Sequence, residues 1–454
     1  MTLWSSANAE SATLGNASAR FGVNGLSIDT RTLKEGDLFV ALKGDNRDGH
    51  DFVRAAFAAK AGAALVSRKP EGGLNGEVGG PLLTVANTQR GLEDLARAAR
   101  ARSNAKILAV TGSAGKTTTK EILRHALNGL GRTHVSAASH NNHWGVPLSL
   151  AALPADAEYG VFEIGMNHFG EIRGLVSFVR PHVAMITTIA PAHLAFFGNC
   201  ESIADAKSEI FEGLVPGGAA LIPADGPYAE RLAARAKQAK VSHLVRFGQK
   251  GEAMLISFTP DGDGMRVKAD ILGRAVDCYV GAPGAHIASN VVGALAAVAL
   301  ADGDVLNAAA GLKDFTALKG RGQRFQSGDV TVIDESYNAN PASMAAALAL
   351  LGAAKGRKIA VLGDMLEMGA GDHHVALAAP IAAAKTDLVF ASGREMKALW
   401  DALPKGQRGI YAETSAALVP ELLGALKPGD TVLVKGSFGS KMALIVDALK
   451  ARGG

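Results

Sequence analysis

The sequence predicts an α/β protein with three domains: a small α/β domain, a central parallel-sheet domain with a phosphate-binding loop, and a dinucleotide-fold-like C-terminal domain. The chain has 454 residues, whereas one hydrophobic core rarely grows past about 250–300 residues. Short apolar runs alternate with helical patterns through most of the chain, which is typical of buried parallel sheets. Hydrophobic residues make up 48% and charged residues 20%, as in ordinary soluble globular proteins.

The first domain is predicted over residues 1–83. Apolar runs at 38–42 and 63–67 predict strands, and residues 51–62 between them predict a helix. The Gly-rich run 72–81 predicts an exposed loop.

The central domain is predicted over residues 84–316. A strand at 107–110 leads into a glycine loop and then a helix at 118–130, which makes a strand–loop–helix unit. Residues 241–280 predict an antiparallel hairpin added to the sheet. The remaining predicted elements are a helix at 92–102 and strands at 159–164, 182–189 and 218–222.

The C-terminal domain is predicted over residues 317–454, with flexible linkers near 83–87 and 315–318. No GxGxxG run follows its first strand, so NAD binding is not predicted. Its predicted strands are 330–334, 359–362, 388–391 and 431–434, and its predicted helices are 341–354, 374–385, 395–403, 415–426 and 440–452.

Charge and cysteine content exclude several classes of protein. The net charge is +4 and the basic residues are scattered, so a nucleic-acid partner is not expected. Cys200 and Cys278 lie in no zinc-type or CxxC spacing, which favours reduced thiols. No signal peptide and no apolar run of about 18 residues is found. We therefore expect a cytoplasmic protein that is not inserted in a membrane.

The run Thr111–Thr117 carries the strongest functional signal. Gly112 and Gly115 permit a tight turn whose N–H groups point at phosphate oxygens, at the positive end of the following helix. Lys116 would reach the β and γ phosphates of ATP, and the Thr117 hydroxyl would hold Mg²⁺. Val110 stands where the common GxxxxGK[ST] pattern has glycine, so a glycine turn with a chance lysine is the alternative.

Three further residues are candidates beside this loop. Glu163 ends an apolar strand and is well placed for Mg²⁺, although a buried helix-capping carboxylate is the alternative. His193 follows another strand, and Lys207 falls on a helix near Asp205 and Glu209. Residue chemistry alone favours a structural histidine and a solvated, paired lysine.

A polar turn, Asp334–Pro341, joins a strand to a helix in the C-terminal domain and is disposed like a ligand site. A plain helix cap is the alternative. Gly363–Met365 and Lys435–Ser437 also end strands and are expected at the same sheet edge.

Several separated motifs together resemble the Mur ligases, over essentially the whole chain. That family too lacks the leading glycine of the loop. The motifs are Thr111–Lys120, Asn141–Leu148, Glu163–Asn167, the His193 segment, Ala206–Ile210, Gly284–His286 with Asn290, Tyr337–Pro341 and Gly363–Gly369.

The resemblance implies roles for individual residues. Lys116, His193 and Lys207 would be catalytic, and Glu163 and His193 would join Thr117 as Mg²⁺ ligands. A carbamate on Lys207 would be a further metal ligand. The ATP site would comprise the loop residues Gly112, Ser113, Ala114, Gly115, Lys116, Thr117 and Thr118, with Asn290, Arg324 (or nearby Arg321), Asp334, Tyr337 and Asn338. The substrates would contact Asp29, Thr30, Arg31, Asp48, His50, Asn142, Asn340, Lys435 and Ser437.

The N-terminal run Asp29–His50 resembles a UDP-binding domain. The resemblance implies a monomeric ligase that uses ATP and Mg²⁺ to join D-alanyl-D-alanine to UDP-N-acetylmuramoyl-tripeptide. No Asp-Asn-Pro-Arg run, frequent in the diaminopimelate-adding member, occurs here. The alternatives are a folylpolyglutamate synthase, which lacks a UDP-binding domain, and a P-loop ATPase that drives partner movement.

Overall fold

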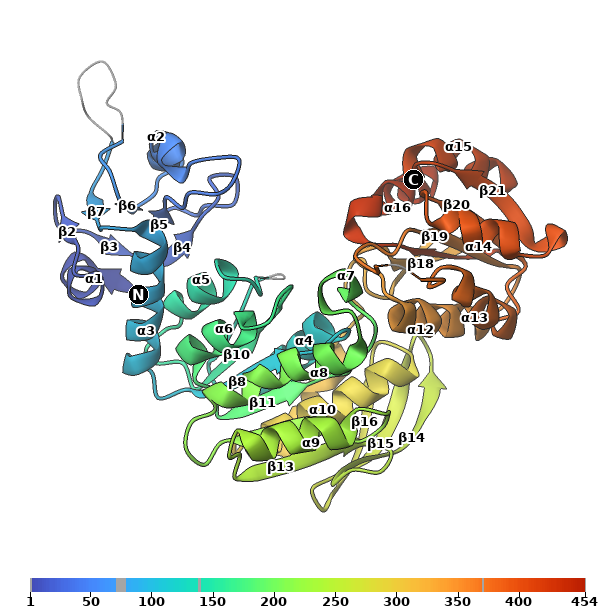
Figure 1. Cartoon of the computed structure of the whole chain (residues 1–454), viewed down its shortest axis with the longest axis horizontal. Helices are drawn as coiled ribbons and strands as arrows, with labels where there is room; N and C mark the ends of the chain where they lie inside the picture. The colour runs from blue at the N-terminus through green and yellow to red at the C-terminus, as the bar shows by residue number, and fades with distance from the viewer. Residues whose placement is uncertain (1, 71–78, 138–139, 370, 454) are drawn as a thin grey trace.

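The computed structural model describes residues 2–70, 79–137, 140–369 and 371–453. Three successive α/β units form a curved arrangement, with the central unit between the other two (Figure 1). The predicted fold class is confirmed. Most of the predicted loop at 72–81 lies outside the described residues.

The N-terminal unit contains a five-stranded sheet of order β2-β7-β6-β5-β4, in which β4 to β7 run parallel. Its strands are β1 (Trp4–Ser5), β2 (Asn16–Ala17), β3 (Gly22–Val23), β4 (Gly25–Ser27), β5 (Asp37–Val40), β6 (Ala63–Val66) and β7 (Leu82–Thr84), and its helices are α1 (Ser6–Thr13) and α2 (Val53–Ala58). The helix predicted over 51–62 is shorter, because residues 49–52 form a 3-10 turn and Lys60 adopts a left-handed conformation with φ 68°. The predicted boundary at residue 83 falls within β7.

A nine-stranded sheet of order β16-β15-β14-β13-β12-β11-β8-β10-β9 forms the central unit. Its strands are β8 (Lys106–Thr111), β9 (Thr133–Val135), β10 (Tyr159–Glu163), β11 (Val183–Ile186), β12 (Ala219–Pro223), β13 (His243–Gly248), β14 (Ala253–Asp261), β15 (Gly264–Ile271) and β16 (Arg274–Val280). Its helices are α3 (Thr88–Arg102), α4 (Lys116–Asn128), α5 (Gly145–Ala151), α6 (Glu171–Val179), α7 (Leu194–Phe197), α8 (Cys200–Ser208), α9 (Ala229–Gln238), α10 (Ala285–Leu300) and α11 (Val305–Ala310).

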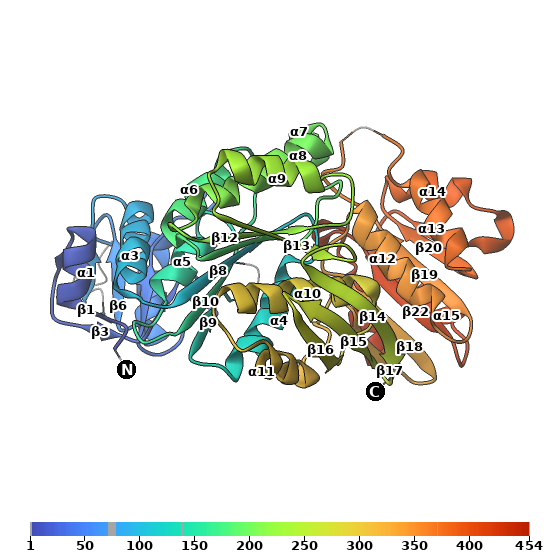
Figure 2. The ribbon, with the colours of Figure 1, turned by 90° about the horizontal axis from the view of Figure 1, so that it is seen from below.

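Helices cover both faces of this central sheet (Figure 2). The strands are parallel from β9 to β14. The region predicted as a hairpin is a three-stranded antiparallel meander, β14 to β16, preceded by the parallel strand β13. The carboxyl ends of β8, β10 and β11 therefore meet at one sheet edge, as parallel strands require.

A six-stranded sheet of order β17-β18-β22-β19-β20-β21 forms the C-terminal unit. Its strands are β17 (Gln323–Ser327), β18 (Val330–Glu335), β19 (Lys358–Gly363), β20 (Leu388–Ser392), β21 (Arg408–Ala412) and β22 (Thr431–Lys435), and its helices are α12 (Pro341–Gly352), α13 (Ala378–Ala383), α14 (Met396–Ala402), α15 (Ser415–Ala425) and α16 (Ala443–Gly453). Strand β21 was not predicted. It is an edge strand containing Arg408 and Gly409, so it lacks the apolar run of a buried strand.

Candidate active site

A cavity of about 560 Å³ lies between the central and C-terminal units. Its central wall comes from the β8–α4 loop, from the ends of β10 and β11, and from α10. The opposite wall comes from the end of β18, the start of α12, and β22. Among the predicted site residues, the cavity is lined by Ser113, Ala114, Gly115, Lys116, Thr117, Thr118, Glu163, His193, Lys207, Asn290, Tyr337, Asn338, Asn340 and Lys435.

The phosphate-binding loop forms the strand–loop–helix unit that the sequence predicted. Gly112 has φ 154°, and a Cβ atom there would lie 1.9 Å from the Thr187 hydroxyl oxygen, so a side chain is excluded. Gly115, with φ 81°, is the N-cap of α4. Val110 is fully buried within β8, since the strand continues to Thr111 before the loop begins. The residue that departs from the common pattern is therefore a core residue.

The Lys116 side chain folds back over the loop, where its Nζ donates a hydrogen bond to the Gly112 carbonyl at 2.8 Å. Burial lowers the pKa of Lys116, while the Glu163 carboxylate opposes this shift and Arg321 adds to it. The ammonium is thus held at the cavity with few competing partners, in position to meet an anionic ligand.

Glu163 is 1% exposed and accepts two hydrogen bonds in the cavity. Thr117 Oγ1 donates to its Oε2 at 2.8 Å, and Asn141 Nδ2 donates to its Oε1 at 2.7 Å. A carboxylate beside a hydroxyl is an oxygen donor set that suits Mg²⁺. In the described ranges no three His, Cys, Asp or Glu residues gather to hold a metal.

Lys207 lies on α8, is 2% exposed and lines the cavity. Within the part of the chain that the structure describes, no hydrogen bond or ion pair joins its ammonium to another residue. Burial lowers the pKa of Lys207 well below its ordinary value, and the Lys116 ammonium lowers it further. The solvated, paired lysine favoured by residue chemistry alone is therefore wrong.

His193 precedes α7 in a left-handed conformation with φ 56°. Its Nδ1 lies 2.5 Å from Oε2 of Glu367, which belongs to the C-terminal unit. Burial lowers the pKa of His193, and the Glu367 carboxylate opposes that shift. The histidine lies at the cavity rather than in a core, in contact with both units.

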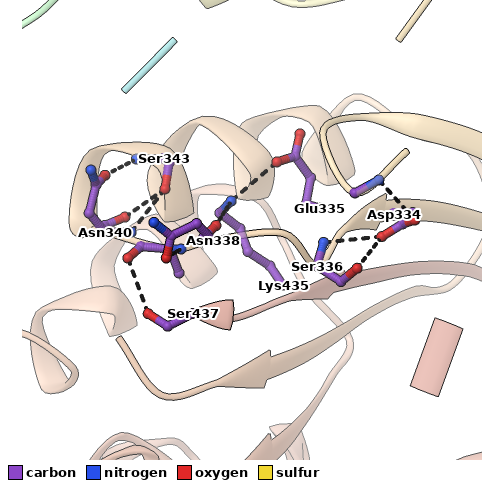
Figure 3. A network of polar contacts seen from close by, with 10 residues as sticks. Asp334, Glu335, Ser336, Asn338, Asn340, Ser343, Lys435 and Ser437 are labelled. Carbon is purple, nitrogen blue, oxygen red and sulfur yellow. Dashed lines mark hydrogen bonds and ion pairs between the residues drawn. The ribbon is translucent and has the colours of Figure 1, made fainter. Parts of the chain in front are cut away.

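Polar contacts organise the C-terminal wall (Figure 3). Lys435 is 2% exposed, and its Nζ contacts Glu335 Oε2 at 3.1 Å and the Asn338 carbonyl at 3.0 Å. Asn340 caps α12 in a capping box with Ser343. Its Nδ2 also donates to the Ser113 carbonyl at 3.1 Å, which joins this wall to the phosphate-binding loop.

Three predicted ATP contacts do not line the cavity: Gly112, Asp334 and Arg324. Asp334 is fully buried, and its carboxylate accepts hydrogen bonds from the Gly320 and Ser336 N–H groups and from the Ser336 hydroxyl. Arg324 is exposed on β17. The alternative, Arg321, does line the cavity and stacks 3.9 Å above the Tyr337 ring. Asp334 thus fixes the turn that carries Arg321.

Asn142 and Ser437 also make internal contacts. Asn142 Oδ1 accepts from the N–H groups of Trp144 and Gly145 at the start of α5, whereas the neighbouring Asn141 faces the cavity. The Ser437 hydroxyl accepts from the Leu366 N–H. His286 lines the cavity, but it was not among the predicted site residues, although the motif Gly284–His286 was part of the resemblance. A single sequence does not distinguish adjacent residues of one motif.

The five predicted UDP contacts lie in the N-terminal unit, outside this cavity. Asp29 pairs with Arg31, whose hydrogen bonds lower the pKa of Asp29 to about 2. His50 is buried between Asp48, 2.6 Å from its Nδ1, and the Ser67 N–H, which donates to its Nε2 at 2.9 Å. These contacts are made within the N-terminal unit. Thr30, the fifth predicted UDP contact, lies between Asp29 and Arg31 in the chain.

Models of the Mur ligase family match most of the chain. The catalytic-domain model matches residues 22–123, the middle-domain model matches 110–298, and the glutamate ligase domain model matches 320–438. The chain is 34% identical to the UDP-N-acetylmuramoyl-tripeptide–D-alanyl-D-alanine ligase of Rickettsia prowazekii, covering 93% of this chain and 94% of that protein. It is 35% identical to the enzyme of that name from Escherichia coli, covering 95% and 94%.

Solved structures agree with these relatives. A crystal structure of MurF from Acinetobacter baumannii superposes with a TM-score of 0.87 at 29% identity, covering 99% of each chain. MurF ligase from Thermotoga maritima in complex with ADP has a TM-score of 0.80 at 24% identity, covering 95% of this chain and 98% of that one.

Proposed function

This chain belongs to the Mur ligase family, and from that membership we propose that it joins D-alanyl-D-alanine to UDP-N-acetylmuramoyl-tripeptide at the expense of ATP. It is an ATP-dependent ligase of peptidoglycan synthesis. The observation that carries the proposal is the cavity, which places a phosphate-binding loop opposite a second polar wall. Such a site can hold a nucleotide and an acceptor together.

The proposed reaction proceeds by phosphoryl transfer to the terminal carboxylate of the tripeptide. The carboxylate oxygen attacks the γ-phosphorus and ADP leaves. The amine of the dipeptide then attacks the acyl phosphate, an amide forms, and phosphate departs with the loss of one proton from nitrogen. Two anions must approach each other in the first step, so Lys116 is assigned to offset their repulsion and the developing charge.

Thr117 and Glu163 are the proposed Mg²⁺ ligands of this chain, with His193 and a modified Lys207 as further candidates. Bound Mg²⁺ would supply charge stabilisation to the phosphoryl group. Asn141 holds the second oxygen of Glu163 and so fixes the direction of the carboxylate. The C-terminal wall is assigned the role of excluding water, which would otherwise hydrolyse the acyl phosphate.

Lys207 is the proposed site of a carbamate. A buried lysine with a lowered pKa offers a neutral amine. Its nitrogen would attack CO₂, a nitrogen–carbon bond would form, and one proton would leave to solvent. The neutral amine would thereby become an anionic oxygen ligand in the cavity that Glu163 also lines.

Carbon-13 NMR of protein equilibrated with labelled bicarbonate tests this modification. A carbamate signal is expected in the wild type and should disappear in Lys207→Met. Lys120→Met is the matched control, because Lys120 is also buried but donates to the Ser136 carbonyl. A wild-type spectrum without a carbamate signal would exclude the modification.

Steady-state assays test the ligase assignment. Purified protein with ATP and Mg²⁺ should release ADP only when the UDP-tripeptide and the dipeptide are both present. Turnover with free D-alanine in place of the dipeptide would contradict the assigned acceptor. Release of ADP without any acceptor would instead favour the alternative of a P-loop ATPase that drives partner movement.

The folylpolyglutamate synthase alternative lacks the N-terminal unit. Relatives that match 93–95% of this chain carry the dipeptide ligase name, which argues against it. Uridine nucleotide binding near Asp29–His50 is the discriminating property.

No helix among the described residues is long and apolar enough to cross a membrane. We place the enzyme in the cytoplasm, where ATP and UDP-linked precursors occur, and expect a monomer, because one chain forms both walls of the cavity. Its product would serve wall growth, and hence cell shape and division.

A further inference from the structure

The contact between His193 and Glu367 joins two units that the chain separates by 174 residues. The Glu367 side chain is 47% exposed and the His193 side chain is 27% exposed. Ion pairs with this much solvent access contribute little to stability. Stability alone therefore gives little reason for this geometry.

Both residues of this contact have uncommon backbone conformations. His193 has φ 56° and Glu367 has φ 63°, the left-handed region that non-glycine residues rarely occupy. Such conformations persist where the surrounding structure enforces them, and they cluster at functional sites. The two segments therefore meet in a defined geometry.

Several contacts enforce the meeting of these segments. The Ala195 N–H donates to the Glu367 carbonyl at 3.2 Å, next to the side-chain contact. Leu194 packs against a core cluster of the C-terminal unit. Met365 and Met368, on either side of Glu367, are 1% and 5% exposed and anchor its loop. In both views the end of α7 lies beside this unit (Figures 1 and 2).

We propose that Glu367 is a positioning residue that orients His193 from the C-terminal unit. A carboxylate at Nδ1 makes that nitrogen the proton donor and leaves Nε2 unprotonated, as a metal-binding imidazole requires. The inference rests on the proposed function, since it takes His193 as a metal ligand. Docking of the C-terminal unit and orientation of this ligand then occur together, so the metal site is complete only in the docked arrangement.

Mn²⁺ binding in the presence of ADP, followed by the electron paramagnetic resonance of free Mn²⁺, tests the proposal on the full-length chain. Glu367→Ala should raise the Mn²⁺ dissociation constant about 10- to 100-fold, the usual effect of losing such a partner. Glu367→Gln should retain part of the affinity, because its amide oxygen still accepts from Nδ1–H. Glu421→Ala, at an exposed position of α15, should bind like the wild type.

Two further measurements separate the outcomes. Wild-type Mn²⁺ affinity in Glu367→Ala overturns the positioning role. If His193→Ala weakens Mn²⁺ binding in that case, His193 keeps its assignment as a metal ligand, and only the role of Glu367 is lost. If His193→Ala also binds like the wild type, that assignment falls as well. ADP affinity in EDTA should stay unchanged in Glu367→Ala, and a parallel loss there would show a purely structural contact and overturn the proposal.

Discussion

The two junctions between the three units are built differently. One continuous apolar cluster joins the N-terminal and central units, with Trp4 and Leu65 packed into the same core as Leu92 and Ile107. The C-terminal unit instead has its own cores on the two faces of its sheet. It meets the central unit around a cavity, through polar contacts such as Asn340 to Ser113.

This difference between the two junctions indicates which of them can open. An apolar junction is closely packed and resists separation, because opening it would expose buried surface to water. A polar junction can exchange its hydrogen bonds for water at small net cost. We therefore expect the N-terminal and central units to move as one rigid body, and the C-terminal unit to open and close to admit substrates.

The largest effect is expected from breaking the chemistry at the polar junction. Lys116→Met should lower the rate of ADP release about 10³-fold, as expected when a preorganised charge is lost from a reacting phosphate. The free energy of unfolding should change little, because Lys116 is a desolvated charge rather than a packing residue. Steady-state kinetics measure the rate of ADP release, and urea unfolding measures the free energy of unfolding. Exposed Lys313→Met is the control, and a tenfold or smaller effect of Lys116→Met would refute its assigned role.

Trp4→Ala attacks the apolar junction. The ring is 2% exposed, its Nε1 donates to the Ala151 carbonyl at 2.9 Å, and Arg102 stacks 3.9 Å above it. The loss should be about 3–5 kcal/mol in the free energy of unfolding, the usual range for a buried tryptophan. Urea denaturation should show both units unfolding together. Leu14→Ala, at a 94% exposed position, should stay within about 0.5 kcal/mol of the wild type. Separate transitions for the two units would argue against a rigid body.

Asn340→Ala tests docking at the polar junction. Losing the cap of α12 should cost about 1 kcal/mol, and the contact with Ser113 disappears as well. Small-angle X-ray scattering should report a more extended average shape. Ser343→Ala breaks the same capping box but leaves the Ser113 contact, so it should keep the wild-type scattering. Equal scattering from both variants would mean that this contact does not hold the units together.

The smallest effect concerns pH at the core of the rigid body. Burial lowers the pKa of His182 to about 4, and its Nδ1 accepts from the Ile107 N–H at 2.9 Å. Because the folded pKa lies below the unfolded value of 6.5, this histidine's stabilising contribution is complete above pH 6.5 and is lost as the pH falls toward 4. Urea midpoints across that range should decline less in His182→Gln, whose amide oxygen still accepts from Ile107. Parallel curves for both proteins would exclude this residue as the cause.

Local patterns predicted most of the fold. The buried strands around Val110 and Ile359 have continuous apolar runs, and their turns contain the expected glycines. Strand β21 was missed because an edge strand needs no such run. Long-range contacts explain the differences at the site. The Asp334 carboxylate accepts a hydrogen bond from the Gly320 N–H instead of facing the cavity, and no spacing in the sequence reveals this contact. The environment of Lys207 depends equally on elements distant in the chain, so composition favoured the wrong interpretation.

The cavity is walled by two bodies, and this has a kinetic consequence. The end of β18 and the loop after β8 wall the cavity from opposite units, so we expect them to part before a product leaves. The C-terminal unit would then move through water, with the predicted linker at residues 315–318 as the connection. Product escape is therefore subject to solvent friction, so turnover should slow as glycerol or sucrose thickens the medium. The chemistry itself is assigned to the cavity that Lys116 and Lys435 line and needs no such movement, so we expect its rate to be independent of viscosity.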